Sequence, residues 1–257
     1  MSYIKHFADR PENYQHFRPD YPDALFHHLV NLVPDRLLAW DCATGNGQAA
    51  CSLAKYFTQV IGSDISQTQL DVAIKKDNIQ YYCWPAEKTT LADHSVDLIT
   101  VAQALHWFNF NDFYREVHRV LKPGGIIAAW CYPLGQIIPP VDAIIRKLYE
   151  EILGDKYWPP ERRYIDNAYQ TIPFPFFPIV TPNFSIIKDY NFSALIGYLN
   201  TWSAVKEYQK RNLQNPLELI MPELKSAWGD INKTHQMVWP LHILLGRHQG
   251  VPTPFVN

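Results

Sequence analysis

Short apolar runs alternate with helix-like segments between residues 37 and 132, and this alternation is the strongest constraint on the fold of the chain. An apolar run bounded by turn residues is typical of a buried strand, whereas apolar residues three and four positions apart indicate a helix. These rules place strands at 37–40, 59–64, 79–84, 96–102 and 126–132, and helices at 48–57, 67–76 and 111–121. Such alternation predicts parallel βαβ units, and hence an α/β fold with a Rossmann-like, mostly parallel sheet covered by helices on both faces.

The segments on either side of this region are less regular. We expect helical structure within residues 1–36 and, after residue 132, one helix followed by a segment rich in proline and aromatic residues. The later elements are a helix at 142–153, a strand at 184–193, helices at 193–208 and 216–230, and a final strand at 237–246. Pro240 favours an edge or a bulge for that last strand, because proline has no N–H to donate.

We therefore predict a single domain of 257 residues that is built from four segments. These are an N-terminal helical cap (1–36), a cofactor-binding core (37–132), a cap insertion (133–183) and the C-terminal part of the sheet (184–257).

The charge and the residue patterns disfavour several classes of partner. The net charge is −2, so the chain lacks the basic field that attracts nucleic acids. No apolar run reaches the roughly 18 residues of a membrane span, and the N-terminus lacks the apolar region of a signal peptide. The four cysteines are scattered, as in reduced cytosolic proteins, and no histidine pattern suggests a metal site. These features predict a cytoplasmic protein, monomeric or homodimeric, that acts on a small molecule and holds no metal.

A loop of small residues, DCATGNG, follows the first predicted strand. Small side chains allow the backbone to approach a ligand closely, and the next helix offers its free N–H groups and positive dipole end. Asp64 ends the following strand, where a carboxylate can accept hydrogen bonds from both hydroxyls of a ribose. Asp41 begins the loop, so it can face the ammonium or sulfonium of a zwitterionic ligand. The combination predicts a binding site for an adenosine cofactor.

Three other interpretations remain open at this level. One is a nicotinamide-dependent oxidoreductase, although its G-x-G-x-x-G fingerprint has a different glycine spacing. Another is a non-catalytic protein that binds an adenosyl ligand. The third is an ordinary βα turn with no ligand.

Residues 37–132 resemble the type 11 group of the class I S-adenosylmethionine-dependent methyltransferases. The resemblance is carried by LLAWDCATGNGQAA, VIGSDIS, PAEKTTLADHSVDLITVAQALHWF and FYREVHRVLKPGGIIAAW. Within that group, the trans-aconitate methyltransferase-like branch is suggested by AQALHWF, RPDYP, TWSAV and WPLHILLGR. The likeness implies a seven-stranded sheet with the last strand antiparallel, S-adenosylmethionine as cofactor, and methyl transfer to a small molecule, of which a carboxylate is one candidate.

The resemblance also implies roles for individual residues. Those expected to bind the cofactor, besides Asp41, are Ala43, Gly45 and Gly47 around its methionine part, Asp64 at the ribose, Ile65, Ala86 and Glu87 at the adenine, and Gln103 and Ala104 beneath the sulfonium. Two positions depart from the family pattern. Ala43 replaces the usual first glycine, and Pro85 stands where many relatives have an aspartate for the adenine amino group.

His106 is the candidate catalytic residue on the acceptor side, because it lies just past the fourth strand, at the edge where such sheets bind ligands. It would orient or deprotonate the acceptor, or bind a carboxylate when charged. The alternative is a histidine that bonds a loop carbonyl and shapes the turn. Tyr14, Arg18 and Trp107 are candidates for contacting the carboxylate of the substrate or cofactor, with an interdomain salt bridge or core packing as the alternative.

Overall fold

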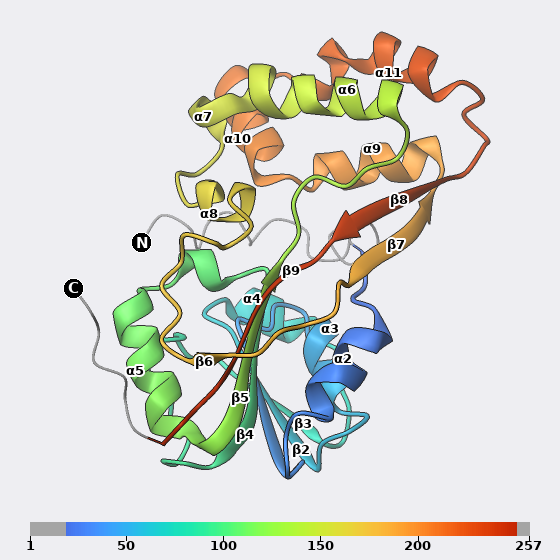
Figure 1. The fold of residues 1–257 in the computed structure, drawn as a ribbon. Coiled ribbons are helices and arrows are strands. Elements are labelled where there is room, and N and C mark those ends of the chain that lie inside the picture. The colour runs from blue at the N-terminus through green and yellow to red at the C-terminus, as the bar shows by residue number, and fades with distance from the viewer. Residues whose placement is uncertain (1–18, 251–257) are drawn as a thin grey trace.

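The computed structural model describes residues 19–250, and its centre is a seven-stranded sheet (Figure 1). The strand order is β3-β2-β1-β4-β5-β9-β6. The strands are β1 Leu38–Cys42, β2 Gln59–Ser63, β3 Ile79–Tyr82, β4 Val96–Ala102, β5 Leu121–Cys131, β6 Phe177–Pro178 and β9 His242–Arg247. Strands β1 to β5 pair in parallel, whereas β9 runs antiparallel to both β5 and β6. The expected mostly parallel sheet with an antiparallel last strand is therefore confirmed.

Helices cover both faces of this sheet. They are α2 Asp23–Val30, α3 Gln48–Leu53, α4 Gln67–Asp71 and α5 Phe110–Val120, with a short 3-10 turn, η2, at Leu105–Trp107. Successive strand residues point to opposite faces, so alternate residues of one strand enter different cores. In β5, for example, Ala128 and Trp130 pack with α2 and α3, whereas Ala129 and Cys131 pack with α5.

Several predicted boundaries need correction. The helices predicted at 48–57 and 67–76 end early, at Leu53 and Asp71. The fifth strand begins at Leu121 rather than at 126, because the glycine-rich turn after α5 is itself part of the extended strand beside β4.

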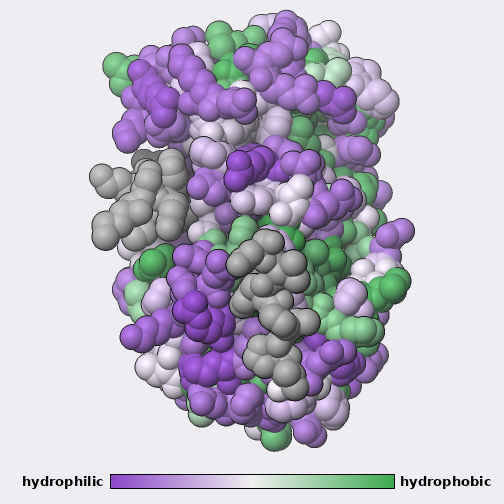
Figure 2. All heavy atoms as spheres, turned by 60° about the vertical axis from the view of Figure 1, so that its left-hand side comes forward, coloured by the Kyte–Doolittle hydropathy of each residue, from purple (hydrophilic) through white to green (hydrophobic). Residues whose placement is uncertain are grey.

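A second layer of helices lies above the carboxyl ends of the parallel strands (Figure 1). It contains α6 Pro139–Lys147, the π-helix η3 Leu148–Leu153, α7 Gly154–Tyr157, α8 Arg162–Asp166, α9 Phe192–Asn200, α10 Ser203–Asn212, the 3-10 turn η4 Pro216–Leu219 and α11 Met221–Trp228. A two-stranded sheet of β7 Ser185–Tyr190 and β8 His235–Pro240 connects the two layers. Figure 2 shows hydrophobic side chains gathered near the level where the layers meet, and mainly hydrophilic ones over the helices above.

The prediction of one continuous strand at 237–246 is wrong. Pro240 ends β8, and β9 starts at His242 in a different sheet. Proline has no N–H to continue a ladder, so the chain changes sheets there. Of residues 184–250, only β9 joins the seven-stranded sheet, although we expected this part of the chain to complete it. The division into four segments stays a prediction, and residues 1–18 of the expected N-terminal cap lie outside the described residues.

Candidate functional site

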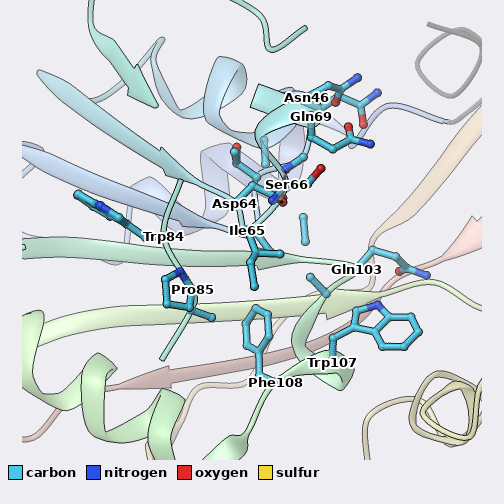
Figure 3. A pocket seen from close by; sticks show the side chains of 18 of the residues that line it. Asn46, Asp64, Ile65, Ser66, Gln69, Trp84, Pro85, Gln103, Trp107 and Phe108 are labelled. Atoms are coloured by element: carbon cyan, nitrogen blue, oxygen red, sulfur yellow. Dashed lines mark hydrogen bonds between the residues drawn. The ribbon is translucent and has the colours of Figure 1, made fainter. Parts of the chain in front are cut away.

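A pocket of about 200 Å³ opens at the carboxyl ends of the parallel strands (Figure 3). Parallel α/β sheets bind ligands at this edge, because the loops that follow the strands converge there. The pocket is lined from the loop after β1 by Ala43, Thr44, Gly45 and Asn46; after β2 by Asp64, Ile65, Ser66 and Gln69; after β3 by Trp84, Pro85, Ala86 and Glu87; after β4 by Gln103, Ala104, Trp107 and Phe108; and by Tyr21, Gln48, Ala49, Ala102 and Tyr132. Most of the predicted site residues are thus brought together, and the exceptions among the described residues are Asp41, Gly47 and His106.

The loop after β1 turns sharply. Ala43 and Gly45 have φ angles of 53° and 56°, in the left-handed region that glycine adopts most easily. Ala43 therefore occupies a backbone conformation that explains why a glycine is usual at this position. Gly47 continues the turn with φ 86° and begins α3 as its N-cap residue. It lies behind the pocket wall, where a Cβ would overlap the hydroxyl of Tyr81.

Asp41 lies beneath the loop rather than facing the pocket, so the expectation that it meets the ligand needs correction. Its carboxylate accepts hydrogen bonds from the hydroxyls of Thr44 (2.5 Å) and Thr100 (2.6 Å) and from the backbone N–H of Ala50 (3.1 Å). The residue is 1 % exposed. Burial raises the pKa of Asp41 to about 6, although the three donors favour its charged form. Asp41 braces the loop and the start of α3.

Asp64 faces the pocket from the end of β2. One carboxylate oxygen accepts the N–H of Gly45 at 2.9 Å, and the other accepts the N–H of Ser66 at 2.8 Å. Burial raises the pKa of Asp64, and these backbone donors oppose the rise. Each carboxylate oxygen has a further lone pair, so Asp64 can still accept hydrogen bonds from a ligand. The loop after β1 is thereby tied to the next strand.

Apolar groups surround the space beyond Asp64. Ile65 is 50 % exposed and points into the pocket, with Phe108 on the opposite side and Pro85 at the edge (Figure 3). A large apolar side chain that stays exposed inside a concave site is typical of a ligand contact. Glu87 lies at the same end, where its carboxylate accepts the N–H of Asn109 at 3.0 Å.

Gln103 forms the wall at the end of β4. It also adopts a left-handed conformation, with φ 56°. Its side-chain carbonyl accepts the N–H of Tyr132 at 2.8 Å, and its amide nitrogen donates to the carbonyl of Tyr132 at 3.3 Å. These two hydrogen bonds between the side chain of Gln103 and the backbone of Tyr132 fix the ends of β4 and β5 relative to each other.

His106 is buried behind this wall, with 5 % of its surface exposed. Its Nδ1 lies 2.9 Å from the hydroxyl of Tyr169, with which it shares a hydrogen bond. Burial, and then the charge of Arg162, lowers the pKa of His106 to about 3. The imidazole is therefore neutral near pH 7, which corrects the expectation that it binds a carboxylate as a cation. The alternative of a turn-shaping histidine fits better, with a tyrosine hydroxyl in place of the expected carbonyl.

The remaining candidates divide into two groups. Trp107 lines the pocket as expected, whereas Tyr14 and Arg18 lie outside the described residues. Sequence reasoning missed Asn46 and Gln69, which line the polar end. Asn46 belongs to the loop DCATGNG, so its position in that loop could have identified it. No local pattern in the sequence distinguished Gln69 in α4.

Comparison with known proteins identifies the class. A family model described as a methyltransferase domain matches residues 40–129. A protein from Dictyostelium discoideum that is named as a methyltransferase is 38 % identical over 250 residues, which are 95 % of either chain. A solved structure from Anaeromyxobacter dehalogenans, described as a type II methyltransferase, has a TM-score of 0.84 at 39 % identity and covers 92 % of this chain and 99 % of its own. This chain belongs to the class I S-adenosylmethionine-dependent methyltransferases.

For this methyltransferase, the expected enzyme class and methyl donor are confirmed. A Saccharomyces cerevisiae protein named as an S-adenosylmethionine-dependent methyltransferase is also similar, at 30 % identity over 129 residues, 47 % of this chain and 44 % of that protein. The family offers no support for the nicotinamide-dependent alternative. Within residues 19–250, no helix is long and apolar enough to cross a membrane, and no group of three or more possible metal ligands is present.

Proposed function

We propose that the pocket binds S-adenosylmethionine and that the enzyme methylates a small organic acid. The observation that carries the proposal is the convergence of Gly45 and Asp64, joined at 2.9 Å, beside the open apolar face of Ile65. A carboxylate next to a tight loop suits a ribose and an amino-acid moiety, and an exposed aliphatic side chain suits a purine. When bound, this cofactor supplies an activated methyl group on a sulfonium.

In this proposal, different residues contact different parts of the cofactor. Asp64 accepts the ribose hydroxyls, while Ile65 packs on the adenine, with Ala86 and Glu87 at its edge. Ala43, Gly45, Gln103 and Ala104 hold the methionine end. Asp41 and Gly47 act from behind the wall by holding the loop and the start of α3 in place. Because Pro85 stands where many relatives have an aspartate, Glu87 or backbone groups would hydrogen-bond to the adenine amino group.

The pocket wall favours an acceptor that is already a nucleophile. Its lining residues within 19–250 include no histidine, lysine or arginine, and their only acids are Asp64 and Glu87. His106 is neutral and does not line the pocket. A carboxylate is ionised at neutral pH and needs no base, so the protein has only to align it and exclude water. An organic acid is also the acceptor class suggested by the resemblance to the trans-aconitate methyltransferase-like branch.

The remaining parts of the proposal come from the sequence. We propose a monomer or homodimer that acts in the cytoplasm without nucleic acid or membrane partners. In this proposal residues 37–132 form the cofactor-binding core, and the segments around it form the cap and complete the sheet.

Calorimetry with S-adenosylmethionine tests the cofactor site directly. We expect Asp64→Asn to bind about 10- to 100-fold more weakly than wild type, because hydrogen bonds to a charged group contribute roughly 1.5–3 kcal/mol. Asp77→Asn, at an exposed acid outside the pocket, is the matched control and should bind like wild type. Equal affinity of Asp64→Asn and wild type would overturn the assignment of the ribose site. Tight binding of NAD without binding of S-adenosylhomocysteine would overturn the proposed function.

A further inference from the structure

Arg162 begins α8, which belongs to the helical layer (Figure 1). This helix contacts the turn η2 that carries Trp107. Its Nε donates to the hydroxyl of Tyr149 at 2.5 Å and to the carboxylate of Asp166 at 3.3 Å. Its guanidinium carbon lies 4.8 Å from the ring centre of Trp158 and 5.0 Å from that of Tyr149. The guanidinium is thus held in place by two aromatic rings and by the hydrogen bonds of Nε to Tyr149 and Asp166.

No residue in the described part of the chain hydrogen-bonds to the two terminal nitrogens of this guanidinium. Neither Nη atom hydrogen-bonds to another residue within 19–250, and neither is among the fully enclosed polar atoms without a partner. The side chain is 17 % exposed, so the Nη edge is sheltered but can be reached. A planar, permanently charged fork of this kind matches the geometry of an oxyanion, which it can bind with two parallel hydrogen bonds.

Arg162 lies close enough to the ends of β4 and β5 for its charge to act on two buried groups there, and its helix α8 contacts the turn η2. This charge lowers the pKa of His106 after the larger effect of burial, and it opposes the rise in the pKa of Cys131 that burial causes. His106 follows β4 and Cys131 ends β5, so both lie beside the wall formed by Gln103, Trp107 and Tyr132. The pocket wall itself carries no cation within the described residues. An acceptor anion that extends from the methylation site toward the helical layer would meet Arg162 as its cationic partner.

We propose that the Nη edge of Arg162 binds an anionic oxygen group of the acceptor, a carboxylate distinct from the atom that is methylated. The inference rests on the proposed function and adds a requirement to it, namely that the acceptor carries at least one further anionic group. A separate group is required because a guanidinium bonded to the reacting oxygen would reduce its nucleophilicity. A purely structural Arg162, which only joins α8 to η3 through Tyr149, is the competing explanation.

The first experiment needs no variant. Wild-type protein saturated with S-adenosylhomocysteine is titrated with glutarate and, separately, with uncharged glutaramide at constant ionic strength, and the heat of binding is measured. We expect saturable binding of glutarate and none of glutaramide. Absence of saturable glutarate binding, or equal binding of the two compounds, would overturn the inference. Failure of S-adenosylhomocysteine itself to bind would instead overturn the proposed function, so the two failures are distinguishable.

Three variants then assign the anion to this residue. Arg162→Gln should weaken glutarate binding at least tenfold while leaving the affinity for S-adenosylhomocysteine within about twofold of wild type. Arg163→Gln changes the exposed arginine next to it on the same helix and should bind glutarate like wild type. Arg162→Lys keeps the charge without the fork, so it should show an intermediate loss, and it replaces the glutamine variant if that one does not fold. If a folded Arg162 variant bound glutarate as tightly as wild type, the inference would be overturned and only the structural role of Arg162 would remain.

Discussion

Replacing Gly47 with alanine should destabilise the protein by an amount that the structure allows us to divide into two parts. Gly47 has φ 86° at the start of α3, and the left-handed conformation costs a residue with a Cβ roughly 1–2 kcal/mol. The new Cβ would also overlap the hydroxyl oxygen of Tyr81 and lie 3.1 Å from its Cζ. Overpacking of this kind typically costs about 1–3 kcal/mol. We therefore expect Gly47→Ala to lower the free energy of unfolding by about 2–5 kcal/mol.

Two further variants separate the conformational part from the steric part. Gly124 has φ 81°, and a Cβ there would meet nothing within 4 Å, so Gly124→Ala measures the conformational part alone, about 1–2 kcal/mol. Tyr81→Phe removes the hydroxyl that would be overlapped but also its 2.7 Å bond to the carbonyl of Ile74, at a cost of about 1 kcal/mol. In the Gly47→Ala/Tyr81→Phe double variant the steric part should be largely relieved, so the two changes should be less than additive by about 1–2 kcal/mol.

Urea unfolding of wild type and these variants, followed by circular dichroism, gives the four free energies of the cycle and the control. The affinity for S-adenosylhomocysteine should fall in Gly47→Ala, because the shifted start of α3 displaces the loop, and it should recover partly in the double variant. Additive losses in the cycle, or a Gly47→Ala loss no larger than that of Gly124→Ala, would refute the role we assign to Tyr81.

Three other predictions follow from the site. Asp41 has a pKa raised from 3.8 to about 6, so its contribution to stability is complete below pH 3.8 and is lost as the pH rises through 6. Relative to Asp41→Asn, wild type should lose about 2 kcal/mol of unfolding free energy between pH 4 and pH 7, and parallel pH profiles would contradict this. Tyr169→Phe removes the bond to His106 and should cost about 1–2 kcal/mol in urea unfolding without changing the affinity for S-adenosylhomocysteine, since neither residue lines the pocket; a large loss of affinity would place the pair in the cofactor site. Ile65→Ala removes an exposed apolar contact, so calorimetry should show about tenfold weaker S-adenosylmethionine binding at a stability within about 0.5 kcal/mol of wild type, and unchanged affinity would contradict the proposed adenine contact.

The sheet and the position of the pocket could be predicted from the sequence because both depend on local patterns. The strand predicted at 96–102 is β4 with the same bounds, and each of the other parallel strands was found within a few residues except for the early start of β5. Parallel strands joined by helices bring their carboxyl ends to one edge of a sheet. Gly45, Asp64 and Gln103 each follow such a strand, so their convergence on one pocket required only the strand order.

The direction of side chains around that pocket could not be predicted in the same way. Asp41 was expected to face the ligand, yet the register of β1 and the shape of the turn direct its carboxylate to Thr44, Thr100 and Ala50. Successive residues in a strand point to opposite faces, so an error of one position at the end of a strand moves a side chain from the pocket to the core.

The sequence by itself determined the fold family, the methyl donor and the loop that begins the site, because strand and helix periodicity and turn residues act over a few neighbouring positions. Only the tertiary structure decided what surrounds the acceptor. His106 is joined to Tyr169, 63 residues later, and the layer that carries Arg162 is assembled from segments on both sides of β6 and β7. Local patterns report that such residues are apolar, polar or charged, but which distant group each one meets depends on the packing of the whole chain.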